Sequence, residues 1–275
     1  MSSKGTAFDG ESSQIYAKIS DQHRHKDGPW ILMLNKVKSF DLPSDAKIVD
    51  VASGPGEPAV TLSTNLPSTI TVFTTDVSPD MHKIAARKAI ENTNLKAMIA
   101  DAVDLSAFDS NSIDVVTCCY GYMFPEDKVK ALSETYRILK PGGKLVATYW
   151  ISLDFLKVAR DVMAAVTGAE SPPPPQNPMS LSESGLFASI AQSGGFNIDT
   201  LEYVESKYPF HLGTDKAFQY KVCTLLIKSK LDELNGHDKA MEVFDSIAQK
   251  YCVTDDATGE LVIHNNVFAM ATLKK

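Results

Sequence analysis

Acidic side chains and glycines occur in this sequence at a spacing that could hold a nucleoside. The first such segment begins at Asp50 and places Gly54 and Gly56 directly after an apolar run. Gly54 permits the positive φ of a tight turn from a strand into a helix, and Gly56 lets a ligand approach the backbone without a Cβ in the way. The first N–H groups of the following helix are unpaired and can bind a polar group. A glycine-rich turn without a ligand remains the alternative.

Two further acids follow predicted strands. Asp76 lies 20 residues after Gly56, at the end of the next β-rich run. A carboxylate there can accept hydrogen bonds from both hydroxyls of a ribose. Capping of the next helix is the alternative role, but Ser78 suits that cap better. Asp101 follows a third run, where it can accept a hydrogen bond from an adenine amino group. Together the glycines and acids predict a bound nucleoside without identifying it.

Strand-like and helix-like runs alternate through the first half of the chain. The runs that predict strands lie at 47–52, 69–75, 97–100, 113–119 and 144–150. Apolar residues at helical spacing predict helices at 57–65, from 78 onward and at 129–139. This alternation with short connections predicts an α/β fold, a parallel sheet with helices on both faces. Ligands of such sheets bind at the carboxyl ends of the strands, where the glycines and acids lie.

The second half of the chain continues the same domain. Five of the 14 prolines fall within 171–178, which predicts an extended surface loop. The elements expected after this loop are a helix at 183–192, a strand at 196–208, helices at 215–234 and 238–251, and a last strand at 266–274.

From Lys47 to Trp150 the sequence resembles the class I S-adenosylmethionine-dependent methyltransferases, in the small-molecule branch that includes ubiquinone/menaquinone-type methyltransferases. Two motifs carry the resemblance: Asp50 ahead of the two glycines, and the run Arg137-Ile-Leu-Lys-Pro-Gly-Gly143 before the fifth predicted strand. The resemblance implies a Rossmann-like seven-stranded sheet with helices on both faces and a last strand antiparallel beside the sixth. It also implies S-adenosyl-L-methionine as the cofactor.

The resemblance assigns the methionine part of the cofactor to the first motif, which includes Asp50. The backbone positions that would cradle this part are Ala52, Ser53, Gly54 and Gly56. Ser53 departs from the family, which more often has Gly or Cys there. The backbone of Cys118 and Cys119 would hold the methionine amino group, and Tyr16 would cover the carboxylate.

The same resemblance assigns the adenosine part to the loops after the second and third predicted strands. Asp76 would bind the ribose, with Val77 and Met81 against the face of the adenine. Asp101 and the backbone of Ala102 would contact the adenine edge.

Aromatic residues gather where the fourth, fifth and sixth predicted strands end. They are Tyr120, Tyr122, Phe124, Tyr149, Trp150, Tyr208 and Phe210. They either belong to the core or form a cage that attracts a sulfonium by cation–π interaction. Such a cage suits a thioether acceptor, which is methylated to a sulfonium without a base, and equally an aromatic or quinone-like acceptor. The catalytic candidates are Tyr122, Tyr149, Trp150 and His211. The histidines at 23, 25 and 211 could act as bases, but we expect them to be solvated or structural.

The charge and hydropathy of the sequence limit the classes of partner that we expect for this chain. Asp and Glu number 34 against 27 Lys and Arg, a net charge of −7, and no basic stripe is present, so we expect no nucleic-acid partner. The basic run 23–26 is expected to be a solvated turn. The start of the chain is polar, no apolar run reaches the roughly 18 residues that a membrane span needs, and the four cysteines form no C-x-x-C motif. We therefore expect a cytoplasmic protein with a small-molecule acceptor and no metal site.

The expected organisation is one domain with two covering segments. Residues 1–46 form an N-terminal helical lid segment, and 47–275 form the methyltransferase domain, with its cofactor half at 47–150 and a lid insertion at about 209–260. A NAD-dependent dehydrogenase of Rossmann type is one alternative, but it would need a Tyr-x-x-x-Lys pair or a second substrate domain. A non-catalytic nucleoside-binding subunit is the other. The sequence leaves the acceptor, the methylated atom and the oligomeric state open.

Overall fold

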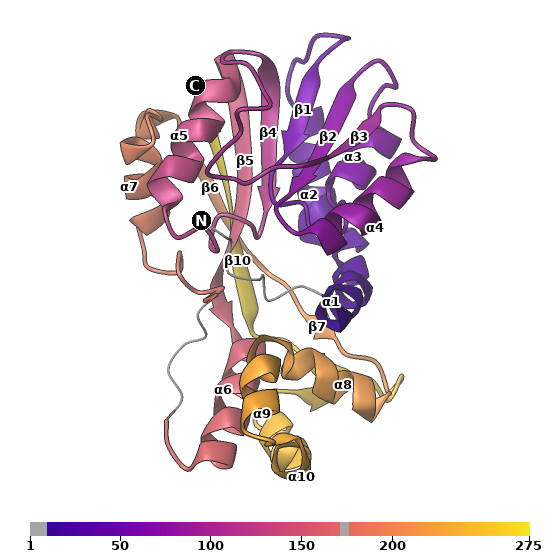
Figure 1. Cartoon of the computed structure of the whole chain (residues 1–275). Coiled ribbons are helices and arrows are strands. Elements are labelled where there is room, and N and C mark those ends of the chain that lie inside the picture. The colour runs from indigo at the N-terminus through magenta and orange to yellow at the C-terminus, as the bar shows by residue number, and fades with distance from the viewer. Residues whose placement is uncertain (1–9, 171–175) are drawn as a thin grey trace.

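A seven-stranded sheet forms the centre of the computed structural model, which describes residues 10–170 and 176–275 (Figure 1). The strand order is β3-β2-β1-β4-β5-β10-β6, and β10 runs antiparallel to both of its neighbours. The strands are β1 (Lys47–Asp50), β2 (Thr71–Asp76), β3 (Leu95–Ile99), β4 (Ile113–Cys119), β5 (Leu139–Leu153), β6 (Glu202–Lys207) and β10 (Asn266–Lys274). This order and the single antiparallel strand confirm the predicted α/β fold.

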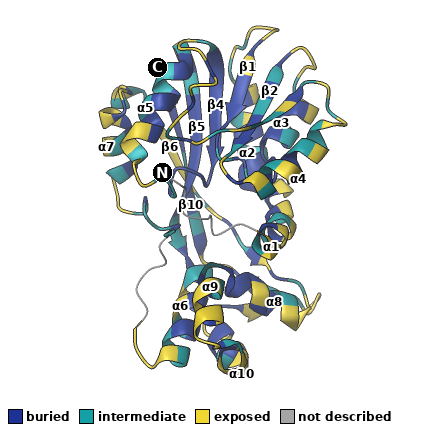
Figure 2. Cartoon of the chain, in the orientation of Figure 1, coloured by how far each residue is buried: buried dark blue, intermediate teal, exposed yellow. Residues whose placement is uncertain are grey.

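The central strands are buried on both faces, and this explains why they are apolar without alternation. All residues of β4 are buried, as are most of those in β5 and β10 (Figure 2). Parallel strands that are covered by helices on both sides have this pattern. The observed bounds of β4 and β10 coincide with the ranges expected from the sequence, 113–119 and 266–274.

Helices cover the sheet on both sides. Those that flank it are α2 (Pro29–Lys38), α3 (Ala59–Asn65), α4 (Pro79–Ala89), α5 (Lys128–Ile138) and α7 (Leu186–Ser193). In Figure 1, α5 and α7 lie together on one side, and α2, α3 and α4 lie on the other. The Ser78 side chain accepts a hydrogen bond from the Met81 N–H at 3.4 Å, and Pro79 takes the first helical position, so Ser78 caps α4 as expected.

A second group of helices lies beyond the carboxyl end of β5 (Figure 1). It contains α6 (Asp154–Thr167), α8 (Lys216–Cys223), α9 (Lys228–Glu233) and α10 (His237–Ala248), with the 3₁₀ turn Leu225–Ile227. A small sheet of order β7-β9-β8 joins it, formed by β7 (Phe210–His211), β9 (Leu261–Ile263) and β8 (Val253–Thr254). From the other end of the chain, α1 (Glu11–Ser20) contacts α8, and the 3₁₀ turn Asp21–Arg24 follows α1.

The fold departs from the sequence-based expectations in several segments. The helix α6 and the small sheet β7-β9-β8 were not expected, and β5 begins at Leu139 instead of 144. The helix expected at 215–234 is divided into α8, the 3₁₀ turn and α9. The strand expected at 196–208 begins only at Glu202. Before it, Asn197 accepts a hydrogen bond from the Asp199 N–H at 3.0 Å and caps a short 3₁₀ turn. Most of the proline-rich loop, at 171–175, lies outside the described residues.

Candidate functional site

A cavity of about 350 Å³ lies at the carboxyl ends of β1, β2, β3 and β4. This volume falls within the range of small-molecule binding sites. It is lined by most of the residues expected to hold a cofactor, namely Tyr16, Ala52, Gly54, Asp76, Val77, Met81, Asp101, Ala102 and Cys119. Asp50, Ser53, Gly56 and Cys118 do not line it. The topology therefore brings the three sequence motifs together in one place.

Asp76 joins two loops of this cavity. Its Oδ2 accepts a hydrogen bond from the Gly54 N–H at 2.8 Å, and its Oδ1 accepts one from the Ser78 N–H at 2.8 Å. Asp76 also lines the cavity. It therefore positions the glycine loop and presents a carboxylate where the sequence predicts a ribose.

Asp50 and Ser53 act behind the cavity instead of lining it. The Asp50 carboxylate accepts hydrogen bonds from the Thr117 hydroxyl at 2.6 Å and from the Ala59 N–H at 3.1 Å, so it holds the start of α3 against β4. Burial raises the pKa of Asp50 well above its usual range. The Ser53 hydroxyl forms a hydrogen bond with the Thr74 hydroxyl and lies 3.2 Å from the carbonyl oxygen of Thr75. Both side chains fix the loop that carries Gly54.

Two glycines near the cavity leave room that a Cβ would fill. Gly56 has a φ of +100°, and a Cβ on it would lie 3.2 Å from the Cα of Ala85 in α4. It permits close packing of α4 and does not line the cavity. Gly121 lines the cavity, and a Cβ on it would lie 2.6 Å from the Cys118 Sγ and 2.7 Å from the Ala52 Cβ. Gly121 thus forms the cavity floor, and Cys118 is buried behind it.

Substituting Gly121 tests this floor. We expect Gly121→Ala to weaken S-adenosylmethionine binding by about tenfold, because the added methyl group must displace Ala52 or Cys118, and overpacking costs about 1–3 kcal/mol. Isothermal titration calorimetry measures the change. Gly194→Ala is the matched control, since its Cβ would lie 2.9 Å from the Leu132 Cβ, against α5. It should lower thermal stability and leave cofactor affinity unchanged. Equal affinity losses in both variants would contradict this role of Gly121.

Other residues of the cavity were not among the expected contacts. They are Ser78, Ala100, Tyr120, Gly121, Phe124, Pro125, Glu126 and Gln176. Most of them belong to the segment directly after β4. Because ligands bind at the carboxyl ends of parallel strands, the position of this segment after a predicted strand was the available signal.

A second, apolar cavity of about 80 Å³ adjoins the first. Tyr16, Tyr120 and Phe124 line both cavities. The walls of the apolar cavity come from α1, from β5 and the start of α6, and from the segment around β7 and α8. Trp150 lines it, as does Phe210, whereas His23 is the single imidazole on its wall. Tyr16, Tyr120 and Phe124 thus lie between the larger cavity, which contains the acidic residues, and the apolar cavity.

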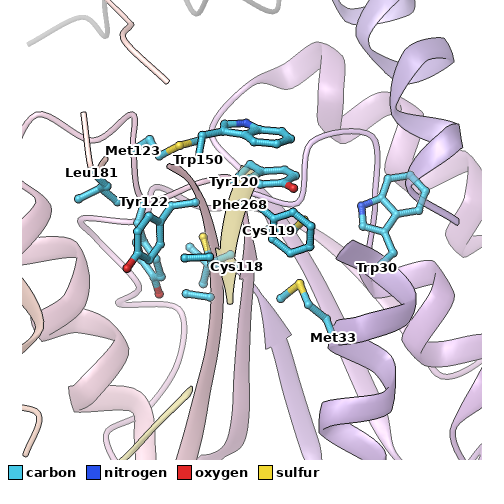
Figure 3. Close-up of a cluster of buried hydrophobic side chains, with 14 of the residues drawn as sticks. Trp30, Met33, Cys118, Cys119, Tyr120, Tyr122, Met123, Trp150, Leu181 and Phe268 are labelled. Carbon is cyan, nitrogen blue, oxygen red and sulfur yellow. The ribbon is translucent and has the colours of Figure 1, made fainter. Parts of the chain in front are cut away.

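Tyr120 is held rigidly at the boundary of the two cavities. Its ring stacks on Trp150 with centroids 4.2 Å apart and an angle of 7° between the planes (Figure 3). Its backbone has a φ of +57°, a left-handed conformation that is unfavourable for a side chain of this size. Strained residues of this kind persist where the surrounding structure fixes them, often at functional sites.

The structure separates the four catalytic candidates. Trp150 faces the apolar cavity, but its neighbour Tyr149 points to the opposite side of β5 and stacks on Phe187 at 4.8 Å. Tyr122 lies on the other side of the strands from Tyr120, and its hydroxyl lies 2.5 Å from the Thr135 hydroxyl (Figure 3). We therefore withdraw Tyr122 and Tyr149 as catalytic candidates, because neither lines the two adjoining cavities.

His211 is also withdrawn. It is exposed on β7, where its Nδ1 lies 3.1 Å from Glu260, while the adjacent Phe210 faces the apolar cavity. The alternation of side chains along a strand accounts for this difference.

The basic run 23–26 is in large part the solvated turn that the sequence suggested, because Arg24, His25 and Lys26 are exposed. His23 is the exception and is buried. Arg24 forms an ion pair with Glu57, whose carboxylate also accepts hydrogen bonds from the Thr61 N–H at 3.0 Å and the Thr61 hydroxyl at 2.8 Å. This ion pair attaches the N-terminal segment to the loop after β1. Within 10–170 and 176–275, no cluster of three or more His, Cys, Asp or Glu side chains could hold a metal ion.

A match to a family model establishes the protein family of this chain. The model of the ubiE/COQ5 methyltransferase family matches residues 21–165, more than half of the sequence. The chain belongs to the ubiE/COQ5 methyltransferase family. The ubiquinone/menaquinone biosynthesis C-methyltransferase UbiE of Rickettsia prowazekii is 34% identical over 162 residues, which cover 55% of this chain and 63% of the relative. The corresponding protein of Rickettsia felis is 38% identical over 120 residues, covering 42% and 46%. The chain thus spans about half to two thirds of the length of these relatives.

Solved structures support the fold of this ubiE/COQ5 family member. Phosphoethanolamine N-methyltransferase 2 of Haemonchus contortus, in complex with phosphomonomethylethanolamine and S-adenosylhomocysteine, has a TM-score of 0.57 at 18% identity, covering 98% of this chain and 58% of that one. The YcgJ protein of Bacillus subtilis has a TM-score of 0.56 at 17% identity, covering 90% and 97%. The [4+2]-cyclase SpnF has a TM-score of 0.52 at 16% identity, covering 96% of both chains. Because a cyclase shares the fold, the fold alone does not define the reaction.

Proposed function

We propose that this protein is an S-adenosylmethionine-dependent methyltransferase that acts on a small-molecule acceptor. The observation that carries the proposal is the pair of adjoining cavities, one formed by the nucleoside-binding motifs and the other apolar, with Tyr16, Tyr120 and Phe124 common to both. Membership in the ubiE/COQ5 family supports it. A dehydrogenase is not supported by any of these observations.

The residues of the larger cavity suit S-adenosylmethionine. Asp76 presents a carboxylate to the cavity, the group that accepts hydrogen bonds from ribose hydroxyls, and Val77 and Met81 supply an apolar wall for the adenine. Asp101 lies at the exposed rim of the cavity, and its Oδ1 accepts a hydrogen bond from the Val103 N–H at 3.1 Å. Gly121 leaves room that a Cβ would fill. When bound, S-adenosylmethionine supplies a methyl group on a positively charged sulfur.

The aromatic residues that both cavities share are the part of the chain that acts on the reacting groups. The rings of Tyr16, Tyr120 and Phe124 can attract a cation, an interaction worth about 0.5–2 kcal/mol for each ring that presents its face. The apolar walls exclude water and hold the acceptor in line with the methyl group. This alignment lowers the entropic part of the activation barrier, because the reactants are already held together before the reaction. No general base is needed unless the nucleophile must lose a proton.

We further propose that the acceptor is aromatic or quinone-like. The walls of the apolar cavity include the stacked pair Tyr120 and Trp150, and flat aromatic molecules pack well against such rings. The relatives named ubiquinone/menaquinone biosynthesis C-methyltransferases support a carbon as the methylated atom. Methylation of a thioether is the second candidate, and the same aromatic cage would stabilise its sulfonium product.

The covering segments are proposed to act as a lid over both cavities. The described part of the N-terminal segment and the insertion at about 209–260 meet where α1 contacts α8, and Lys221 forms an ion pair with Glu11 at 2.9 Å. No helix in the described part of the chain has the length and hydropathy that crossing a bilayer requires. The four cysteines are free and buried, which supports a reducing compartment, and we propose the cytoplasm. We propose no nucleic-acid partner.

The test is methyl transfer from labelled S-adenosylmethionine to a metabolite extract by the purified protein. We expect the label in small apolar molecules, and mass spectrometry of the products then distinguishes ring methylation from a sulfonium. Label found only in macromolecules would contradict the proposal. Calorimetric titration with S-adenosylmethionine and with NAD separates a methyltransferase from a dehydrogenase. Binding of S-adenosylmethionine without turnover on any extract would favour a non-catalytic nucleoside-binding subunit.

A further inference from the structure

Two polar atoms, in residues that line the apolar cavity, have no hydrogen-bond partner among the described residues. They are the Nδ1 of His23 and the hydroxyl oxygen of Tyr120, and both are fully buried. Leaving a buried polar atom without a partner costs about 1–3 kcal/mol, so such atoms are uncommon and call for an explanation. Both residues line the same cavity, which is otherwise apolar in this region. A ligand that carries one polar group would satisfy them.

Aromatic rings surround His23, and none of them offers its Nδ1 a hydrogen-bond partner. Its ring lies among aromatic rings, with centroid distances of 5.2 Å to Tyr208, 5.5 Å to Trp30, 5.6 Å to Phe210 and 5.7 Å to Tyr120. This burial lowers the pKa of His23 to about 3. The imidazole is therefore neutral at neutral pH and offers one donor and one acceptor nitrogen. A phenylalanine would fill the same space without the cost of an unpartnered nitrogen.

We propose that His23 binds a hydroxyl group of the methyl acceptor, with the Tyr120 hydroxyl as a second contact. This assignment rests on the proposed function and adds a residue that determines acceptor specificity. A hydroxyl both donates and accepts hydrogen bonds, so it suits the neutral imidazole in either tautomer. The ligand class is an apolar aromatic molecule with a ring hydroxyl. His23 belongs to the 3₁₀ turn Asp21–Arg24, and the Arg24–Glu57 ion pair fixes this turn to the cofactor loop.

The experiment measures binding of two matched probes, 2-naphthol and naphthalene, which differ by one hydroxyl. Equilibrium dialysis is carried out with saturating S-adenosylhomocysteine. We expect His23→Phe to weaken 2-naphthol binding by about tenfold and to leave naphthalene binding unchanged, because only the hydroxyl loses its partner. Equal effects on both probes, no effect on 2-naphthol, or a wild-type protein that binds neither probe would overturn the assignment.

A second variant separates recognition from folding. His23→Gln keeps a donor and an acceptor and should retain most of the preference for 2-naphthol that His23→Phe loses. Unchanged affinity for S-adenosylhomocysteine establishes that each variant is folded. If both variants lose that affinity, Tyr120→Phe is measured instead, and an unchanged preference for 2-naphthol in Tyr120→Phe then overturns the assignment. Binding of the probes does not require turnover, so a wild type that shows the preference but transfers no methyl group refutes the proposed function and not the hydroxyl site.

Discussion

Replacing Asp76 with alanine is expected to weaken S-adenosylmethionine binding by about 100-fold, measured by isothermal titration calorimetry. The substitution removes the carboxylate that accepts hydrogen bonds from the Gly54 and Ser78 N–H groups, so the loops after β1 and β2 lose their common anchor. It also removes the proposed ribose contact. Hydrogen bonds to a charged group contribute about 1.5–3 kcal/mol each, and about 1.4 kcal/mol corresponds to a factor of ten. Loss of two such bonds to the ribose hydroxyls, at about 1.5 kcal/mol each, gives the expected factor.

Two further variants define what the Asp76 carboxylate contributes. Asp76→Asn keeps the shape and one acceptor oxygen but turns a donor toward one of the two N–H groups, so its affinity should lie between those of the wild type and Asp76→Ala. Asp109→Ala is the matched control, because Asp109 is exposed and precedes β4, at the opposite edge of the sheet. Its affinity should equal that of the wild type. An affinity of Asp76→Ala within threefold of the wild type would remove Asp76 from the cofactor site.

The cofactor half was largely predictable because its signals are local. Gly54, Asp76 and Asp101 each follow a strand that is visible as a run of β-branched or apolar residues, and parallel strands bring their carboxyl ends to one edge. The sequence could not distinguish residues that line the cavity from those that support it. Asp50 and Gly56 belong to the same motif as Gly54, yet one turns inward to hold α3 and the other packs against α4.

The acceptor side was less predictable because it is assembled from distant segments. His23 reaches the apolar cavity from the N-terminal part of the chain and meets Phe210, which the sequence places almost 190 residues away. Tyr120 and Tyr122 both follow the fourth predicted strand, and the sequence offers no basis for preferring Tyr122 as the catalytic candidate. The left-handed backbone at Tyr120 turns the chain as β4 ends, so the side chains that follow no longer alternate. No sequence pattern predicts this turn, because tyrosine rarely adopts the left-handed backbone conformation.

Tyr120→Ala is expected to lower methyl-transfer kcat/KM by about 100-fold. The ring is lost from the boundary that both cavities share, so water can enter and the acceptor is held less well in line, and a misplacement of about 1 Å can cost a factor of this size. Trp150 loses its stacking partner at the same time. Steady-state kinetics with the acceptor found in the extract assay measure the effect. Affinity for S-adenosylhomocysteine should fall by no more than about tenfold, because the loops that carry Gly54 and Asp76 are unchanged.

Tyr120→Gly separates the ring from the backbone strain. Glycine adopts a φ of +57° without the penalty of a Cβ, about 1–2 kcal/mol, so Tyr120→Gly should be more thermally stable than Tyr120→Ala although both lack the ring. Their kcat/KM values should be equally low, since activity depends on the ring. If Tyr120→Gly recovers activity in proportion to its stability, the loss in Tyr120→Ala arises from destabilisation, and Tyr120 is then a core residue. Equal activity losses at different melting temperatures instead assign the effect to the aromatic boundary between the two cavities.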